Sequence, residues 1–220
     1  MSSACATRLQ LALDRAIAWR RRELVAAYLA APSDEVAARV YFRQALLLLY
    51  AHMEGFVKSA ATQYVYVIAE TGTPTEHLCE ALLGMALKSS VARAKDSGSL
   101  RALGRLFIDA MATPPVIAKL RHTNVIKTGS NLTSKRLRAI IESIGLDSAR
   151  YSLIEHDVID RLVKWRNGIA HGEGIPVDRA DYALMHHNVI DFLDDIKQYL
   201  EDSAAADAYL TVIKRNSSKY

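Results

Sequence analysis

The segment from about residue 34 to residue 70 constrains the fold most, because its apolar residues recur at spacings of three and four over its whole length. The residues of this stripe are Phe42, Leu46, Leu49, Met53, Phe56, Ala60, Tyr64 and Val67. A stripe of this length is typical of a long helix that packs against other helices. We expect Ser33 or Asp34 to cap its start, and Gly72 and Pro74 to end it.

The rest of the chain also favours helices, because only five prolines and ten glycines occur in 220 residues. Periodic apolar positions predict further helices at 7–31, 75–90, 98–112, 133–144, 153–171 and 176–201, with an extended connector at 124–131. No internal repeat and no Gly-rich phosphate loop occurs in the sequence. We therefore predict an all-α, single-domain helical bundle of about six helices over residues 1–203, followed by a loosely held tail at 204–220.

Composition narrows the classes of protein that the chain can belong to. Half of the residues are hydrophobic and 24% are charged, which suits a packed domain better than a disordered chain. The net charge of +4 is mild, and by itself it favours ordinary surface charge over nucleic-acid binding. The longest apolar run, 45–51, is too short for a membrane span of ~20 residues. Cys5 and Cys79 have neither zinc-ligand nor disulfide-framework spacing. We expect a cytoplasmic protein without a membrane segment, metal ion or cofactor.

The six residues from Arg166 to His171, Arg-Asn-Gly-Ile-Ala-His, carry most of the functional information. A guanidinium can bind two phosphate oxygens in a fork, and an imidazole can transfer protons near neutral pH. Residues five apart on a helix lie ~140° apart around the axis, so Arg166 and His171 share no face, whereas Asn167 and His171 do. Two helix ends meeting across a two-fold axis would bring these groups together. The alternative is structural, because basic residues near a helix C-terminus oppose the macrodipole.

A second group of polar residues lies in the long helix. Tyr50, Glu54 and Lys58 are spaced by four and share one stripe next to the apolar seam. One interpretation is a Glu54–Lys58 pair worth only a few tenths of a kcal/mol; the other is that Glu54 orients Arg166 or the imidazole. Gly55 costs ~1 kcal/mol relative to alanine inside a helix, which indicates that another element approaches closely there.

Arg166 to His171 resembles the motif of arginine, four residues and histidine in HEPN domains. These domains form a superfamily of small helical-bundle ribonucleases in toxin–antitoxin, phage-defence and CRISPR systems. Three further stretches resemble one prokaryotic HEPN branch. They are Leu-Tyr-Ala-His-Met-Glu-Gly-Phe-Val-Lys at 49–58, Ser-Asn-Leu-Thr at 130–133 and Ala-His-Gly-Glu at 170–173. Together the stretches span about 40–175 in this order on a helical chain.

The resemblance implies an HEPN-like homodimer with a composite active site that cleaves RNA without a metal ion. It implies that Arg166 and His171 are the catalytic pair, that Asn167 positions them or the phosphate, and that Glu54 is a supporting polar residue. An antitoxin or another regulatory protein is an expected partner. Some HEPN toxins carry a tyrosine two residues after the histidine, which a partner nucleotidyltransferase modifies. Glu173 stands at that position here, so this mode of neutralisation is not implied.

The sequence therefore favours a metal-independent endoribonuclease that cleaves single-stranded RNA by 2′-hydroxyl attack, as a toxin or phage-defence effector. One alternative is a non-catalytic HEPN-type helical dimer that binds a nucleotide or a protein partner; another is a purely structural bundle. Replacing Arg166 or His171 by alanine separates these hypotheses, since only the first predicts a loss of activity. Trp165, Ile169 and part of the 176–200 helix are the expected dimer contact.

Overall fold

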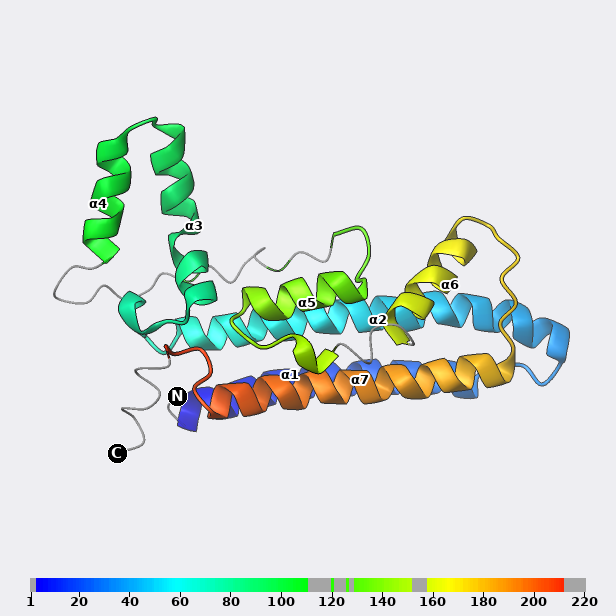
Figure 1. Ribbon diagram of the computed structural model, residues 1–220. Helices are drawn as coiled ribbons and strands as arrows, with labels where there is room; N and C mark the ends of the chain where they lie inside the picture. Colours follow the sequence, from blue (N-terminus) through cyan, green and yellow to red (C-terminus); the bar gives the residue numbers. More distant parts are fainter. Residues whose placement is uncertain (1–2, 111–119, 121–125, 127–128, 152–157, 212–220) are drawn as a thin grey trace.

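The computed structural model describes residues 3–110, 120, 126, 129–151 and 158–211. Seven α-helices occur in these ranges (Figure 1). They are α1 (Ser3–Leu29), α2 (Glu35–Ala69), α3 (Glu80–Asp96), α4 (Leu100–Ala110), α5 (Ser134–Ser143), α6 (Asp160–Ala170) and α7 (Arg179–Ala205). Two short 3₁₀ helices, η1 (Thr75–His77) and η2 (Ala149–Tyr151), complete the set. The predicted all-α class is confirmed. Pro114, Pro115 and most of the predicted 124–131 connector lie outside the described residues.

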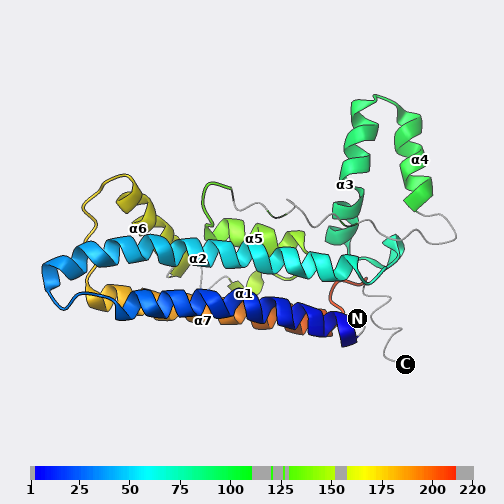
Figure 2. The same cartoon turned by 180° about the vertical axis from the view of Figure 1, so that it is seen from behind.

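The long helices α1, α2 and α7 form a three-helix bundle, in which each contacts the other two (Figures 1 and 2). Helices α5 and α6 cover the opposite side of α2, while the α3–α4 hairpin projects from one end of the bundle. Helices α1, α5, α6 and α7 thus all contact α2, which explains its buried positions on several faces. The eight residues of the predicted stripe are all buried.

Polar residues cap the starts of α2 and α7, and the start of α7 lies three residues later than predicted. Asp34 caps α2 as predicted, because its side chain accepts a hydrogen bond from the N–H of Ala37. Helix α7 begins at Arg179 instead of residue 176, because Asp178 provides its cap by accepting from the N–H of Asp181. The predicted 153–171 helix is seen as α6, and the residues 152–157 before it are outside the described part.

A contact with the end of the chain interrupts the predicted 75–90 helix. Leu78 forms an isolated antiparallel bridge with Leu210, and the N–H of Cys79 donates to the carbonyl of Tyr209 at 2.8 Å. This extended pair separates η1 from α3. Helix α7 continues to Ala205, and both Tyr209 and Leu210 are buried. The segment 204–211 is therefore packed, in contrast to the loosely held tail expected there, and 212–220 lie outside the described residues.

No helix among the described residues is both long enough and apolar enough to cross a bilayer.

Candidate functional site

The six-residue motif lies at the C-terminal end of α6, and a Schellman turn fixes its geometry. The N–H of Glu173 donates to the carbonyl of Gly168 at 2.8 Å, and that of Gly172 donates to Ile169 at 3.1 Å. Gly172 has φ +82°, a left-handed conformation that favours glycine. His171 is the last residue before this glycine and its side chain is exposed. The turn thus ends the helix directly after His171 and presents the imidazole to solvent.

Arg166 lies on the inner side of α6. It follows buried Val163 by three residues and buried Ile159 by seven, so its side chain starts from the face of α6 that faces α2. Its guanidinium carbon lies 4.9 Å from the ring centroid of Tyr50, which is buried on α2. This cation–π contact holds the positive charge against the aromatic face.

Two asparagine side chains hold one nitrogen of Arg166. Nη1 donates to Oδ1 of Asn131 at 2.8 Å and to Oδ1 of Asn167 at 2.8 Å. Among the described residues, no carboxylate pairs with Arg166, and no acceptor is recorded for its Nε or Nη2. One edge of the guanidinium is therefore fixed by neutral groups, while the Nε–Nη2 edge keeps the geometry that binds two phosphate oxygens.

Tyr50 joins α2 to the segment before α5. Its hydroxyl oxygen accepts a hydrogen bond from the N–H of Leu132 at 2.7 Å. Burial raises the pKa of Tyr50 to about 12, with a further contribution from the hydrogen bond and charge of the Glu54 carboxylate. Tyr50 therefore stays neutral near pH 7, and it links Glu54 to the residues that face Arg166.

The start of α5 places Asn131 beside Arg166. Thr133 caps the helix by accepting from the N–H of Arg136 at 3.2 Å. The carboxylate of Asp160, in the first turn of α6, accepts from the N–H of Ser134 at 2.9 Å and from its hydroxyl at 2.7 Å. These bonds tie the 131–134 segment to α6, so that the Asn131 amide meets the guanidinium.

The structure brings together only part of the predicted set. Arg166 and Asn167 are in contact, whereas Glu54 reaches them only through Tyr50. No Glu54–Lys58 ion pair occurs in the described part of the chain. Within the same ranges, Arg166 and His171 do not touch each other. Tyr50 and Asn131 lie in stretches that resemble HEPN domains, but no spacing in the sequence marks either residue as a neighbour of Arg166.

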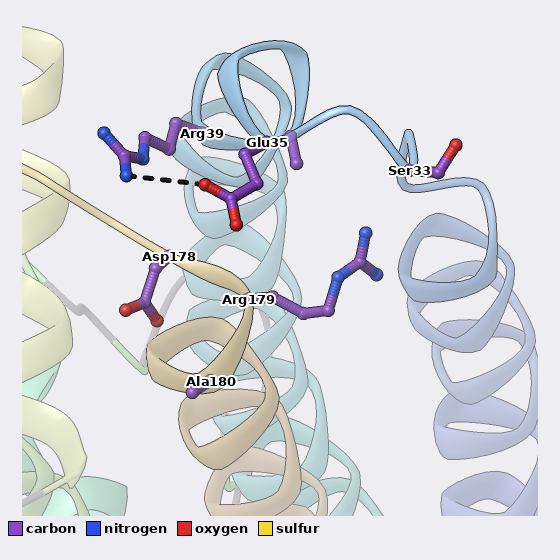
Figure 3. Close-up of a pocket in the computed structure, with 7 residues that line it drawn as sticks. Ser33, Glu35, Arg39, Asp178, Arg179 and Ala180 are labelled. Carbon is purple, nitrogen blue, oxygen red and sulfur yellow. Dashed lines mark ion pairs between the residues drawn. The ribbon is translucent and has the colours of Figure 1, made fainter.

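A separate pocket of about 400 Å³ lies at the end of the bundle, where α2 and α7 begin (Figure 3). Its basic residues are already engaged: Arg39 pairs with Glu35 at 4.0 Å, and Arg179 donates to the carbonyl of Pro32 at 2.6 Å. None of the predicted site residues lines this pocket. It therefore adds no residue to the site around Arg166.

No cluster of three or more His, Cys, Asp or Glu side chains that could hold a metal ion is found in the described residues.

Comparison with protein families identifies the chain. The family model for MAE_28990-like HEPN domains matches residues 9–209, which includes every helix from α2 to α7. The chain belongs to the MAE_28990-like HEPN family. No curated protein and no solved structure matches the chain. Membership of the HEPN superfamily indicates an RNA-related role in general, and the four HEPN-like stretches coincide with the site around Arg166 and the helix end at His171.

Proposed function

We propose that this HEPN protein is an endoribonuclease that cleaves single-stranded RNA without a metal ion, as a toxin or phage-defence effector. The observation that supports this function best is how the guanidinium of Arg166 is held and which of its N–H groups have partners. Its guanidinium is positioned by Asn131, Asn167 and Tyr50, and among the described residues no carboxylate neutralises it and no group accepts from its Nε–Nη2 edge. A positioned cation with a free bidentate edge suits a phosphodiester.

The reaction needs only groups that RNA and this chain supply. The 2′-oxygen attacks the adjacent phosphorus while the bond from phosphorus to the 5′-oxygen breaks, which gives a 2′,3′-cyclic phosphate and a 5′-hydroxyl. One His171 imidazole takes the 2′ proton, and a second imidazole in its protonated form gives a proton to the leaving 5′-oxygen. Arg166 stabilises the negative charge that develops on the phosphate oxygens. Asn167 and Asn131 keep the guanidinium in place.

The first test is cleavage of a labelled single-stranded RNA in the presence of excess EDTA. We expect the rate to be unchanged by the chelator, because the nucleophile is the substrate's own hydroxyl and the proton transfers use imidazole. The products should carry cyclic phosphate and 5′-hydroxyl ends, which end-specific enzymatic labelling distinguishes from 5′-phosphate ends. Complete loss of cleavage in EDTA would show that a metal ion drives the reaction.

A homodimer provides the second imidazole. Arg166 faces inward and His171 lies exposed at the helix end, so one chain holds the two groups apart. Leu184 on α7 is 53% exposed, and Trp165 and Ile169 on α6 are partly exposed, which leaves apolar surface on both helices. These three residues are the proposed centre of the dimer contact.

We expect sedimentation to show about twice the chain mass of 24.3 kDa at micromolar concentration, since a stable interface of ~1,600 Å² needs apolar contact of this kind. Leu184→Glu should shift the protein towards monomer and lower the activity with it. Val36 is also an exposed apolar residue, but it lies on α2. Val36→Glu is therefore the matched control and should leave the sedimenting mass of the protein unchanged. A monomeric wild type with full activity would contradict the shared site.

The separation of Arg166 and His171 within one chain is also what a non-catalytic HEPN dimer would show. Such a dimer would use Arg166 to bind a nucleotide or a protein partner. The two functions differ in the effect of His171→Ala, which removes an exposed side chain. Loss of cleavage with unchanged binding supports the nuclease, whereas an unchanged phenotype supports the binding module.

A further inference from the structure

A second arginine without a carboxylate partner lies on the other side of α2. Arg20 on α1 is only 9% exposed. One of its nitrogens, Nη1, donates to the carbonyl of Ala16 in its own helix, and its buried Nε has no hydrogen-bond partner. Among the described residues no carboxylate pairs with it. A guanidinium is costly to bury without a counter-charge, so this cation is a candidate for binding an anion.

Aromatic rings fix the plane of this guanidinium. The Trp19 ring centroid lies 4.4 Å from its central carbon, and that of Phe56 lies 5.8 Å away. Trp19 is 45% exposed and so marks the place where the cluster reaches the surface. Because rings hold the plane, an incoming anion can reach only the edge of the guanidinium, where its N–H groups point.

Gly55 lies beside that edge. A Cβ at this position would lie 3.4 Å from Nη2 of Arg20. An oxygen that accepts a hydrogen bond from Nη2 needs to lie ~2.9 Å from it, in the region that a side chain at residue 55 would narrow. The glycine in the middle of α2 therefore has a physical reason, which is the approach of Arg20 and of whatever Arg20 binds.

Glu23, three residues after Arg20 on α1, lies against a histidine. Oε2 of Glu23 lies 3.1 Å from Nε2 of His52, which is buried and also meets the Trp19 ring edge-on. Burial lowers the pKa of His52, and the charge of Arg20 lowers it further, while Glu23 opposes both effects. Glu23 thus lies beside the histidine, and no carboxylate of the described residues pairs with Arg20.

The two arginines flank one exposed ridge of α2. Arg166 contacts Tyr50 of α2, and Arg20 contacts Gly55 of the same helix. These two positions are five residues apart, which is ~7.5 Å along the helix axis and ~140° around it. Glu54, Lys58 and Ala51 lie on the arc between them; Ala51 and Lys58 are exposed, and Glu54 is half-buried and bonded to the Tyr50 hydroxyl. A nucleic-acid strand that leaves Arg166 can cross this arc over the small side chain of Ala51 and past the ammonium of Lys58 towards Arg20.

We propose that Arg20, positioned by Trp19 and with its Nη2 beside Gly55, binds a backbone phosphate of the RNA strand beyond the cleavage site. The subsite rests on the proposed function, because it extends the path of the same substrate. It makes no contact with the scissile phosphate and is a binding element.

The test uses Gly55→Ala, which should fold, because 3.4 Å is ordinary contact and alanine favours helix. The probe is a single strand of about ten nucleotides, fully 2′-O-methylated so that it cannot be cleaved. Fluorescence anisotropy at low salt should show binding weakened by about 10-fold, because one buried charged contact is obstructed. Gly84→Ala on α3 is the matched control, since nothing lies within 4 Å of its Cβ position, and it should bind as wild type does.

A second variant tests the arginine itself. Arg20→Lys keeps the charge but loses the planar fork, and we expect binding to weaken by about 10-fold here as well. Cleavage assays with substrates of two lengths add a control. KM for a ten-nucleotide RNA should rise in Gly55→Ala. KM for a dinucleotide should not change, because a dinucleotide is too short to reach Arg20. A general distortion of the fold would raise both values.

Each other outcome overturns a defined part of the proposal. If Gly55→Ala binds the methylated strand as tightly as wild type, the subsite is wrong and the nuclease proposal stands. If wild type binds no RNA at low salt, the proposed function fails together with the subsite. If pyrophosphate or ATP binds wild type as tightly as the ten-nucleotide strand and Gly55→Ala weakens only that binding, Arg20 serves a small phosphate ligand and the RNA subsite is wrong.

Discussion

His171→Ala is expected to reduce RNA cleavage by about 100-fold or more, the usual effect of removing a general acid or base. The side chain is exposed at the end of α6 and no interaction in the described residues depends on it, so the variant should keep its fold and dimer. Single-turnover cleavage of a labelled RNA measures the effect, and thermal unfolding confirms the fold. His77→Ala, at a partly exposed histidine of η1, is the control and should cleave normally.

Arg166 needs a more conservative change, because it is partly buried and holds Asn131, Asn167 and the ring of Tyr50 together. Arg166→Ala should also lower cleavage by about 100-fold, but part of that loss can come from the disturbed site. Arg166→Lys retains the charge and loses the fork, so a large loss in this folded variant assigns the effect to phosphate binding. Full activity in either Arg166→Lys or His171→Ala would refute the catalytic role of that residue.

A substrate with a single 2′-deoxy residue at the cleaved position should lose cleavage there almost completely, by a larger factor than any variant of the protein. The missing hydroxyl is the nucleophile of the proposed reaction, and no group of the protein replaces it. The strand otherwise keeps its phosphates, so its binding should change little. Product mapping at nucleotide resolution measures the loss at the altered position, with cleavage at unmodified sites in the same strand as an internal standard.

An all-deoxy strand of the same sequence extends this test. Uncut DNA that still competes with RNA for binding would support internal attack by the 2′-hydroxyl. Equal cleavage of DNA and RNA would show that water is the nucleophile, and the assignment of His171 to the 2′ proton would then be wrong.

The helices were predictable because apolar residues recur in them at spacings of three and four, and a polar side chain caps the start of α2, α5 and α7. Asp34 and the stripe from Phe42 to Val67 define α2 almost to the residue. The break at Leu78 was not predictable, because it depends on a bridge to Leu210, more than a hundred residues away, and no local signal marks such a pairing. The start of α7 at Arg179 was only partly predictable from the sequence. Asp178 is a favourable N-cap residue, but Pro176 is also a favourable first helical residue.

The site was predictable as a set of stretches but not as a set of contacts. The inner position of Arg166 follows from its spacing to Val163 and Ile159. Its partner Asn131 lies 35 residues earlier in the chain, and helical period says nothing about which segment α6 meets. The role of Tyr50 also depends on tertiary contact, because its hydroxyl accepts from the backbone of Leu132. The possible Glu54–Lys58 ion pair could not be decided from the sequence for the same reason. Helical spacing permits the pair, but in the structure Glu54 is the hydrogen-bond partner of the buried Tyr50 hydroxyl.

The packing of the last long helix against the first has a consequence for synthesis. Helix α7 contacts both α1 and α2, so the bundle that supports α2 closes only after residues up to about 205 have left the ribosome. The groups around Arg166 depend on α2 for Tyr50 and are therefore assembled late. A chain that lacks α7 should therefore leave α2, and with it the Tyr50 ring beside Arg166, without this support.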